Sequence, residues 1–402
     1  MKREKKFTYF FVAIVIKIAL RVVLGYRIKA DEAVKKLKRG KDPFVVLSAH
    51  PSELDAAPLL AALYPRYGRI VAGAQQVCKG AQGRLFRMMN VIPKKQFVPD
   101  LNAVREMLQT VKDGHVLAFM PEGRVSMDGL PSPIDPSCAK LVKKLRVPVV
   151  GFIAHGTYFV KPPYDYNGIH CGRIGGELKL IATAEEAAAL SIPELEAKID
   201  AALAYDASEE LRNGLADRRG YGPHRAPYMK QISRLLYACP VCGAEYSIAD
   251  ANSRVFCTAC GADAKLSRRM LFELDTEPAL PADLSAWSRF QKELEERRVK
   301  DPDFRLVYPV RKAMKLLTED TPFVPRCEGT LTLDREKLRY EDAEESLEVP
   351  VKSLPGLSAD YMDGSVVLYR DEVMRRFYLP DPRDVSRIMN TLMALRKNEE
   401  TK

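Results

Sequence analysis

Short apolar segments alternate with helix-type segments between residues 43 and 205, and this alternation constrains the fold more than any other feature of the chain. Apolar runs that suit buried strands occupy residues 44–48, 69–73, 116–120, 147–153 and 177–182. Segments with helical spacing occupy residues 101–112, 137–146 and 193–204, and Ser191 with Glu194 forms a capping box before the last of them. The alternation predicts an α/β domain, layered around a mostly parallel sheet, with active groups where strands end.

The first predicted strand runs into a histidine and an acid five residues apart, His50 and Asp55. If the strand stops near Ala49 and a helix starts around Asp55, the carboxylate can hold one imidazole nitrogen and leave the other free to accept a proton. We therefore expect His50 to be a general base and Asp55 to orient it. The alternatives are a purely structural histidine and a Ser-His-Asp set that uses Ser52. Ser52 fits better as a helix cap, because the chain has no G-x-S-x-G elbow.

A second strand-end motif follows the apolar run 116–120, where the chain continues as Pro121-Glu122-Gly123-Arg124. Bare glycine backbone and a guanidinium at one turn can bind an anion together. The motif therefore predicts phosphate recognition by residues 122–124. The alternative is that Glu122 only completes the turn.

At these two motifs the sequence resembles the glycerol-phosphate and lysophosphatidate acyltransferases. His50–Asp55 is similar to the H-x4-D block of that family, and Met120–Arg124 is similar to its PEG block. Gly83–Lys94 resembles the block between them, and Val147–Phe152 resembles the closing strand. The resemblance covers residues 20–205, and four blocks in the expected order are more specific than any one alone.

The chain departs from the family pattern at three places. Ala49 stands where the family usually has asparagine, and Lys94, with Lys95 beside it, stands where the family usually has arginine. Lysine binds phosphate as a point charge and lacks the bidentate fork of arginine. Arg124 follows the glycine of the PEG block directly, without the small residue that separates the two in the family.

The resemblance implies acyl transfer from acyl-CoA or acyl carrier protein to 1-acyl-glycerol 3-phosphate, which gives phosphatidic acid. It implies that His50 deprotonates the acceptor hydroxyl, that Asp55 supports His50, and that Lys94, Lys95 and Arg124 hold the phosphate. Two alternatives keep the domain and change its role. One is transfer to another lysophospholipid, and the other is a degenerate, membrane-docked adaptor that binds partners through its cysteine-rich segment.

The basic excess of the chain is concentrated at its start. Residues 1–41 hold thirteen Lys or Arg and three Asp or Glu, which accounts for the net charge of +10. The apolar stretch 7–24 is broken only by Lys17 and Arg21, and basic residues flank it on both sides. This pattern predicts an amphipathic helix in the cytoplasmic leaflet of an anionic membrane, with Lys17 and Arg21 snorkelling outward. A single span and a cleaved signal peptide are the alternatives, and no nucleic-acid partner is expected because the stretch is aromatic and aliphatic.

Four of the eight cysteines form two C-x2-C pairs, each followed by glycine and separated by fourteen residues. Two such knuckles close one tetrahedral S4 site, so we expect structural zinc bound by Cys239, Cys242, Cys257 and Cys260. A redox-active pair is the alternative. Reduced thiols and zinc favour the cytoplasm, and the other four cysteines are expected to be small hydrophobic residues: Cys78, Cys138, Cys171 and Cys327.

The remaining patterns complete the predicted organisation. A Gly- and Pro-rich charged stretch predicts a linker, and alternating segments after Gly329, with an Asp363-Gly364 turn and a final helical pattern, resemble a pleckstrin-homology or GRAM-type barrel. The predicted domains are a membrane-binding segment (1–41), an acyltransferase domain (42–216), a linker (217–235), a zinc ribbon (236–272), a helical connector (273–328) and a β domain that ends in a helix (329–402).

Overall fold

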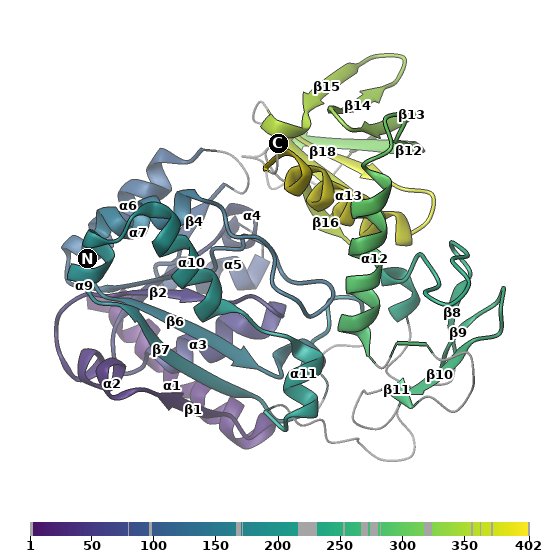
Figure 1. Ribbon diagram of the computed structural model, residues 1–402. Coiled ribbons are helices and arrows are strands. Elements are labelled where there is room, and N and C mark those ends of the chain that lie inside the picture. Colours follow the sequence, from purple (N-terminus) through teal and green to yellow (C-terminus); the bar gives the residue numbers. More distant parts are fainter. Residues whose placement is uncertain are drawn as a thin grey trace. The chain divides into compact units, whose positions relative to one another are not determined.

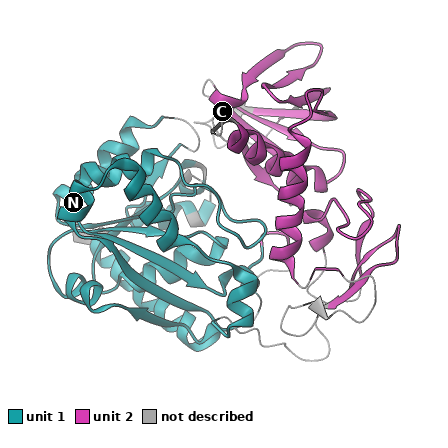
Figure 2. Cartoon of the chain, viewed as in Figure 1, with its two compact units in different colours: residues 1–162, 169–221 teal, residues 163–168, 222–402 magenta. Residues whose placement is uncertain are grey.

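A computed structural model divides the chain into two compact units (Figure 2). Unit 1 comprises residues 1–162 and 169–221, and unit 2 comprises residues 163–168 and 222–402. The structure describes residues 3–400 except 79, 96–98, 166–169, 171, 216–230, 252–253, 267–271, 274–279, 282, 317–323, 355–356, 362 and 371–372. The predicted linker sequence 217–230 therefore lies outside the described residues, whereas the end of that predicted segment forms the short helix η2 (Ile232–Leu235).

Unit 1 is built on a seven-stranded sheet with the order β1-β7-β6-β2-β5-β3-β4 (Figure 1). Neighbouring strands run parallel except β6 and β7, which pair antiparallel. The strands are β1 (Arg27–Ala30), β2 (Val45–Ser48), β3 (Gly68–Gly73), β4 (Ile92–Lys94), β5 (Val116–Phe119), β6 (Val149–His155) and β7 (Gly175–Ala182). The predicted mostly parallel α/β sheet is confirmed, and all five predicted strands are present.

Helices cover both faces of this sheet, so its central strands are buried on both sides. Phe44 and Val46 pack in one core with α1 (Arg3–Leu24) and α3 (Ala56–Leu63), while Val45 and Leu47 pack in a second core with helices of the other face. The helices of that second face are α6 (Leu101–Lys112), α7 (Ser137–Leu145), α9 (Ala184–Ala189) and α10 (Ile192–Leu203). The alternation along β2 is what a pleated strand between two helical layers requires.

The remaining helical segments of unit 1 are short: α2 (Glu32–Arg39), η1 (Glu53–Asp55), α4 (Ala74–Cys78), α5 (Gly80–Met88), α8 (Thr157–Val160) and α11 (Ala207–Arg212). The predicted capping box of Ser191 and Glu194 is confirmed at the start of α10.

The predicted boundary of the membrane-binding segment at residue 41 is wrong. Strand β1 pairs with β7, and Val34 of α2 is buried in the core beside α1 and α3, so residues 27–39 belong to the α/β layers. The sequence pattern concealed β1 because it is a short edge strand, and its basic residues Arg27 and Lys29 are its two most exposed positions.

Unit 2 contains two antiparallel sheets. The smaller has the order β11-β10-β9-β8, formed by β8 (Ile248–Ala251), β9 (Arg254–Cys257), β10 (Asp263–Leu266) and β11 (Phe272–Glu273). The larger has the order β15-β14-β13-β12-β18-β17-β16, formed by β12 (Arg305–Leu316), β13 (Val324–Asp334), β14 (Lys337–Glu341), β15 (Ser346–Pro350), β16 (Leu357–Asp360), β17 (Ser365–Arg370) and β18 (Val373–Tyr378).

The described part of unit 2 also contains η2, α12 (Leu284–Arg298) before the larger sheet, η3 (Val351–Ser353) after β15, and α13 (Arg383–Glu400) after β18. The predicted antiparallel β domain ending in a helix is confirmed. The Asp363-Gly364 turn also lies where predicted, between β16 and β17, and Gly364 has a φ of +68° that suits glycine.

The predicted helical connector 273–328 is only partly helical. Residues 284–298 form α12, but β12 and the start of β13 belong to the C-terminal sheet. Pro309 made the segment look unlike a strand. β18 pairs only with residues 311–316 of β12, so Pro309 has a strand partner on the β13 side alone, and proline is compatible with such an edge-like position.

Candidate active site and metal centre

His50 and Asp55 form a pair at the carboxyl end of β2. The Ala49 amide still donates to the Phe152 carbonyl of β6, and His50 follows as the chain leaves the sheet. Ser52 caps η1 in a capping box with Asp55, which turns the chain back toward His50. His50 Nδ1 lies 3.1 Å from Asp55 Oδ2, and 17% of the His50 side chain is exposed. The predicted geometry is present: the carboxylate faces Nδ1, which directs the available lone pair to Nε2.

Asp55 is fully buried and accepts hydrogen bonds at both oxygens. The Ser52 amide donates to Oδ2 at 2.6 Å, and the Thr157 hydroxyl donates to Oδ1 at 2.5 Å. Burial raises the pKa of Asp55, while the bonds from His50, Thr157 and Ser52 oppose that rise by stabilising the carboxylate. A buried acid that holds a histidine in this way can fix its tautomer without contacting a substrate.

Glu122 holds the loop after β5 against the loop after β2. Its Oε1 accepts the His50 amide at 2.9 Å, and its Oε2 accepts the Ser132 amide at 2.8 Å. The side chain is buried, and burial raises the pKa of Glu122 to about 7. Because both oxygens are engaged by backbone amides, the geometry favours the alternative in which Glu122 shapes the turn. Ser126 adds a further tie by donating its amide to the His50 carbonyl.

The predicted phosphate-binding residues lie on two different strands. Gly123, with a φ of +67° and open space where a Cβ would be, and Arg124 follow β5, which is the immediate neighbour of β2. Lys94 ends β4 and Lys95 follows it; in the sheet β4 lies three strands from β2, roughly 14 Å away at ~4.8 Å a strand. Burial lowers the pKa of Lys94, which faces Asp100 and Asp135.

A second histidine–acid cluster supports the same edge of the sheet. His155 ends β6, and its Nδ1 lies 2.6 Å from Glu210 Oε1 on α11. Glu210 Oε2 accepts the Gly156 amide at 3.1 Å, which fixes the turn that leads to Thr157. The His155–Glu210 and Asp55–Thr157 contacts have no local sequence signal, because their partners are 55 and 102 residues apart in the chain. The pairing of β2 with β6 brings Thr157 close to Asp55, and α11 brings Glu210 to the end of β6, so only the tertiary structure reveals these contacts.

Helix α1 has two apolar faces. Tyr9, Ala13, Leu20 and Leu24 are buried against the unit, where α1 contacts α3. An outer stripe is exposed at helical spacing: Phe7, Phe11, Ile14, Val15, Ile18 and Val22. By length and composition the segment Lys6–Leu24 suffices to cross a membrane. The expectation that Lys17 snorkels outward is wrong: its ammonium lies 5.1 Å from the centre of the Tyr64 ring, whereas Arg21 is exposed.

The four cysteines of the two knuckles converge in unit 2. Their sulfur atoms all lie within 4.8 Å of one another, with Cys239 to Cys260 at 3.9 Å and Cys242 to Cys257 at 3.8 Å. Four sulfurs at a Zn–S distance of ~2.3 Å form a tetrahedron with edges of roughly 3.8 Å, so the donor set fits a tetrahedral S4 metal. Gly243 and Gly261 have φ values of +73° and +74°, as the predicted knuckle turns require.

The segment before the first cysteine is held by α12. Trp287 donates its indole N–H to the Ala238 carbonyl at 2.9 Å, and Gln291 Oε1 accepts the amides of Tyr237 and Ala238. Gln291 also donates to the Leu235 carbonyl. All four contacts are buried, so the segment that leads into the first cysteine pair and α12 share one core.

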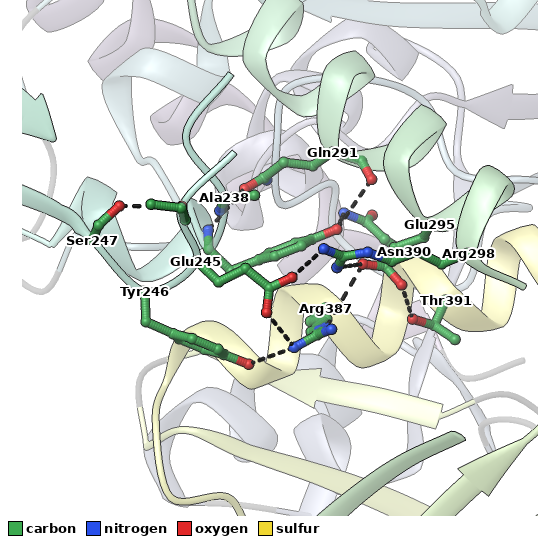
Figure 3. Close-up of polar contacts among 12 residues, drawn as sticks. Ala238, Glu245, Tyr246, Ser247, Gln291, Glu295, Arg298, Arg387, Asn390 and Thr391 are labelled. Carbon is green, nitrogen blue, oxygen red and sulfur yellow. Dashed lines mark hydrogen bonds and ion pairs between the residues drawn. The ribbon is translucent and has the colours of Figure 1, made fainter. Parts of the chain in front are cut away.

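The segment after the second cysteine joins α12 to α13 through partly buried charges (Figure 3). Glu245 pairs with Arg298 of α12 and with Arg387 of α13, the latter at 3.0 Å. Tyr246 donates its hydroxyl to Asp384 at 2.6 Å and accepts from Arg387 at 3.1 Å. These contacts place the ribbon, α12 and α13 in one connected hydrogen-bond network.

The other cysteines differ in their surroundings. Cys138 is buried in the core beside α6, as expected, and burial raises its pKa to about 12. Cys327 is not an ordinary hydrophobic residue, because its thiol donates to Asp342 at 2.9 Å in a site that also contains the buried Lys312. The side chain of Cys78 and all of Cys171 lie outside the described residues.

Comparisons with known proteins find similarity in the region that contains this site. The sequence model of the acyltransferase family matches residues 26–154, a range that includes His50, Asp55 and residues 122–124. Residues 26–154 are therefore similar to the acyltransferase family, and the predicted resemblance is confirmed.

Two individual proteins are similar over this region. The chain is 29% identical over 133 residues to the chloroplastic 1-acyl-sn-glycerol-3-phosphate acyltransferase BAT2 of Brassica napus. That match covers 33% of this chain and 38% of the relative, so the chain spans well under half of that protein in the comparison. The crystal structure of the 1-acyl-sn-glycerophosphate (LPA) acyltransferase PlsC from Thermotoga maritima matches with a TM-score of 0.41 and 18% identity, over 52% of this chain and 81% of that one.

Proposed function

We propose that the chain is a membrane-bound acyltransferase that makes phosphatidic acid from 1-acyl-glycerol 3-phosphate and an acyl thioester. The single observation that carries the proposal is the His50–Asp55 pair, held at 3.1 Å at a strand end inside the range matched by the acyltransferase family. The donor is acyl-CoA or acyl carrier protein, which supply the same thioester carbonyl.

The proposed reaction needs one base and no acyl-enzyme. His50 Nε2 takes the proton of the acceptor hydroxyl as its oxygen attacks the thioester carbonyl carbon. Collapse of the tetrahedral intermediate breaks the C–S bond, and the imidazolium returns the proton to the leaving thiolate. Asp55 stabilises the imidazolium through Nδ1–H, and Glu122 positions the His50 backbone.

The phosphate group is proposed to bind first to the Gly123–Arg124 turn. On one glycerol unit the phosphate lies only a few ångströms from the free hydroxyl, and the turn leaves the strand next to β2. Lys94 and Lys95, on a strand roughly 14 Å farther across the sheet, are proposed to add a more distant positive field. This arrangement predicts that loss of the Arg124 charge weakens phosphate binding more than loss of the charge of Lys94 or Lys95, and this difference can be tested directly.

The outer stripe of α1 is proposed to lie in the cytoplasmic leaflet of an anionic membrane. The helix buries one face on the protein and exposes Phe, Ile and Val on the opposite face. Because the buried face already packs against the protein, only the outer face can contact lipid, which suits a monotopic position. Basic residues on both sides of the stretch favour the same anionic surface.

The cysteine cluster is proposed to hold structural zinc. Cys239, Cys242, Cys257 and Cys260 fill four tetrahedral positions and leave none open for water, so the metal would stabilise unit 2 without joining the reaction.

The function is tested with purified full-length protein in detergent micelles. We expect transfer of radiolabelled palmitate from palmitoyl-CoA or palmitoyl acyl carrier protein to 1-acyl-glycerol 3-phosphate, with lower kcat/KM for lysophosphatidylcholine and lysophosphatidylethanolamine. Preference for one of those acceptors would replace the substrate assignment. Absence of transfer with every donor and acceptor would reject the enzyme and favour the adaptor.

A further inference from the structure

The two oxygens of Asp55 are held by different parts of the fold. Oδ2 faces His50 and the Ser52 amide, both within the loop that follows β2. Oδ1 is contacted by Thr157, which begins α8 after β6. His50 and Ser52 are therefore local partners of the acid, whereas Thr157 reaches it from the neighbouring strand.

We propose that Thr157 is a positioning residue for the general base: its hydroxyl holds the buried Asp55 carboxylate ionised and in the rotamer that orients His50. The proposal rests on the proposed function for its kinetic consequence. The proposal concerns contacts among residues of this chain, so one of its consequences, the tautomer of His50, can be measured without substrate.

The direction of the Thr157 hydroxyl follows from the strength of its two acceptors. Thr157 Oγ1 lies 2.5 Å from Asp55 Oδ1 and 3.0 Å from the Ala154 carbonyl, and one hydroxyl has one proton. A carboxylate is a stronger acceptor than a carbonyl, and the shorter distance is typical of a charge-assisted bond. The proton therefore lies toward Asp55.

The position of Thr157 is itself fixed. Thr157 is fully buried and follows Gly156, whose φ of +78° turns the chain out of β6. Glu210 holds that turn through the Gly156 amide and the His155 ring. A side chain fixed on a rigid turn can hold its acceptor at small cost in conformational entropy.

The titratable groups around the His50–Asp55 pair influence how its protonation responds to a change at Thr157. Glu122 in the loop after β5 and Tyr205 after α10 act electrostatically on this pair. Neither hydrogen bonds to Asp55. The loss of the Thr157 donor leaves the anion with the His50 and Ser52 contacts only, which favours protonation of Asp55. Because the active pair requires ionised Asp55 and neutral His50, its population at a given pH then falls.

The test compares Thr157→Val, which keeps the shape and removes the hydroxyl, with Thr157→Ser, which keeps the hydroxyl. We expect Thr157→Val to lower kcat/KM by about 10- to 100-fold, as loss of one bond to a charged group implies, with KM for both substrates unchanged. The acid limb of the pH profile of kcat/KM should move to higher pH. Thr157→Ser should restore both the rate and the limb.

A second readout needs no turnover. In protein labelled with 15N-histidine, the His50 signals should show Nδ1–H in the wild type and a mixture of tautomers in Thr157→Val. His115→Ala removes one competing signal and leaves the pair intact.

Three results would overturn the inference. The first is a Thr157→Val variant with unchanged kcat/KM and an unmoved acid limb. The second is equal impairment of the valine and serine variants with an unmoved limb, which would indicate only a packing role. The third is an unchanged His50 tautomer. If the wild type transfers no acyl group, the proposed function fails, and the NMR comparison still decides the role of Thr157.

Discussion

Removal of the zinc proposed for the cysteine cluster should disorder more of unit 2 than the ribbon itself. Four buried side-chain bonds from Trp287 and Gln291 hold residues 235–238, which lead directly into Cys239. At ~1 kcal/mol each, they contribute about 4 kcal/mol that depends on an ordered knuckle. Structural zinc contributes roughly 10–16 kcal/mol to small domains, which is comparable to the whole stability of a domain. The ribbon should therefore unfold without metal, and α12 should lose these contacts.

The size of the effect on melting follows from the same contacts. For a unit of this size, ~1 kcal/mol shifts Tm by roughly 2–4 °C, so loss of about 4 kcal/mol should lower the Tm of unit 2 by roughly 8–16 °C. The charge network of Glu245 with Arg298 and Arg387 would add to this shift, because it joins the ribbon to α12 and α13.

The chain supplies its own probe for this experiment. Trp287 is the only tryptophan, it is fully buried, and its indole N–H is bonded to the residue before Cys239. Chelation of the full-length protein, followed by metal analysis, should shift the Trp287 emission to longer wavelength, and added zinc should reverse the shift. Cys257→Ser should behave like the chelated protein, while Cys327→Ser, outside the cluster, should behave like the wild type. An unchanged emission spectrum and Tm in metal-free protein would refute the coupling.

Three further outcomes are expected. Because burial raises the pKa of Glu122 to about 7 from a usual value near 4.5, its contribution to stability should be full below pH 4.5 and lost as pH rises toward 7, by on the order of 3 kcal/mol. Urea unfolding should therefore show a steeper fall of stability over this pH range in the wild type than in Glu122→Gln. Val22→Asp, on the exposed stripe of α1, should reduce binding to anionic vesicles by about tenfold or more in flotation assays, whereas Val307→Asp, at an exposed valine of unit 2, should not. Arg124→Gln should raise KM for 1-acyl-glycerol 3-phosphate more than Lys94→Gln does in steady-state assays, because its strand is the neighbour of β2.

Each of these has a clear contrary result. Parallel pH curves for wild type and Glu122→Gln would show that the buried carboxyl does not titrate in this range. Equal vesicle binding of the two valine variants would remove α1 from the membrane contact. A larger KM effect at Lys94 would place the phosphate farther across the sheet than proposed.

The elements that sequence patterns identified are those whose signals are local. The apolar runs around Val45 and Val116, the cap at Ser52, and the repeated cysteine spacing each depend on residues close in the chain, and the structure contains all of them. Strand β12 lies in the segment predicted as a helical connector, and Pro309, which has no amide proton, is unusual inside a strand. In the structure β18 pairs only with residues 311–316 of β12, which leaves Pro309 with a strand partner on one side only.

The parts of the site that could not be predicted depend on sheet order. Thr157 meets Asp55, and Glu210 meets His155, only because β2 and β6 are neighbours and α11 packs at their ends. Glu122 was assigned to substrate on its motif, but its two amide partners, His50 and Ser132, become visible only when the loops after β2 and β5 are placed together. Local spacing thus identified the proposed reacting groups, while the residues that support them became visible only in the tertiary structure.

The most direct test of the central claim measures acyl transfer by purified His50→Ala and Asp55→Asn proteins against a His115→Ala control. A positioned general base contributes about 100- to 10,000-fold, so kcat for 1-acyl-glycerol 3-phosphate should fall by at least about 100-fold in His50→Ala. Asp55→Asn should fall with it, and His115→Ala should match the wild type. Full activity in His50→Ala protein that folds and binds membranes normally would contradict the account.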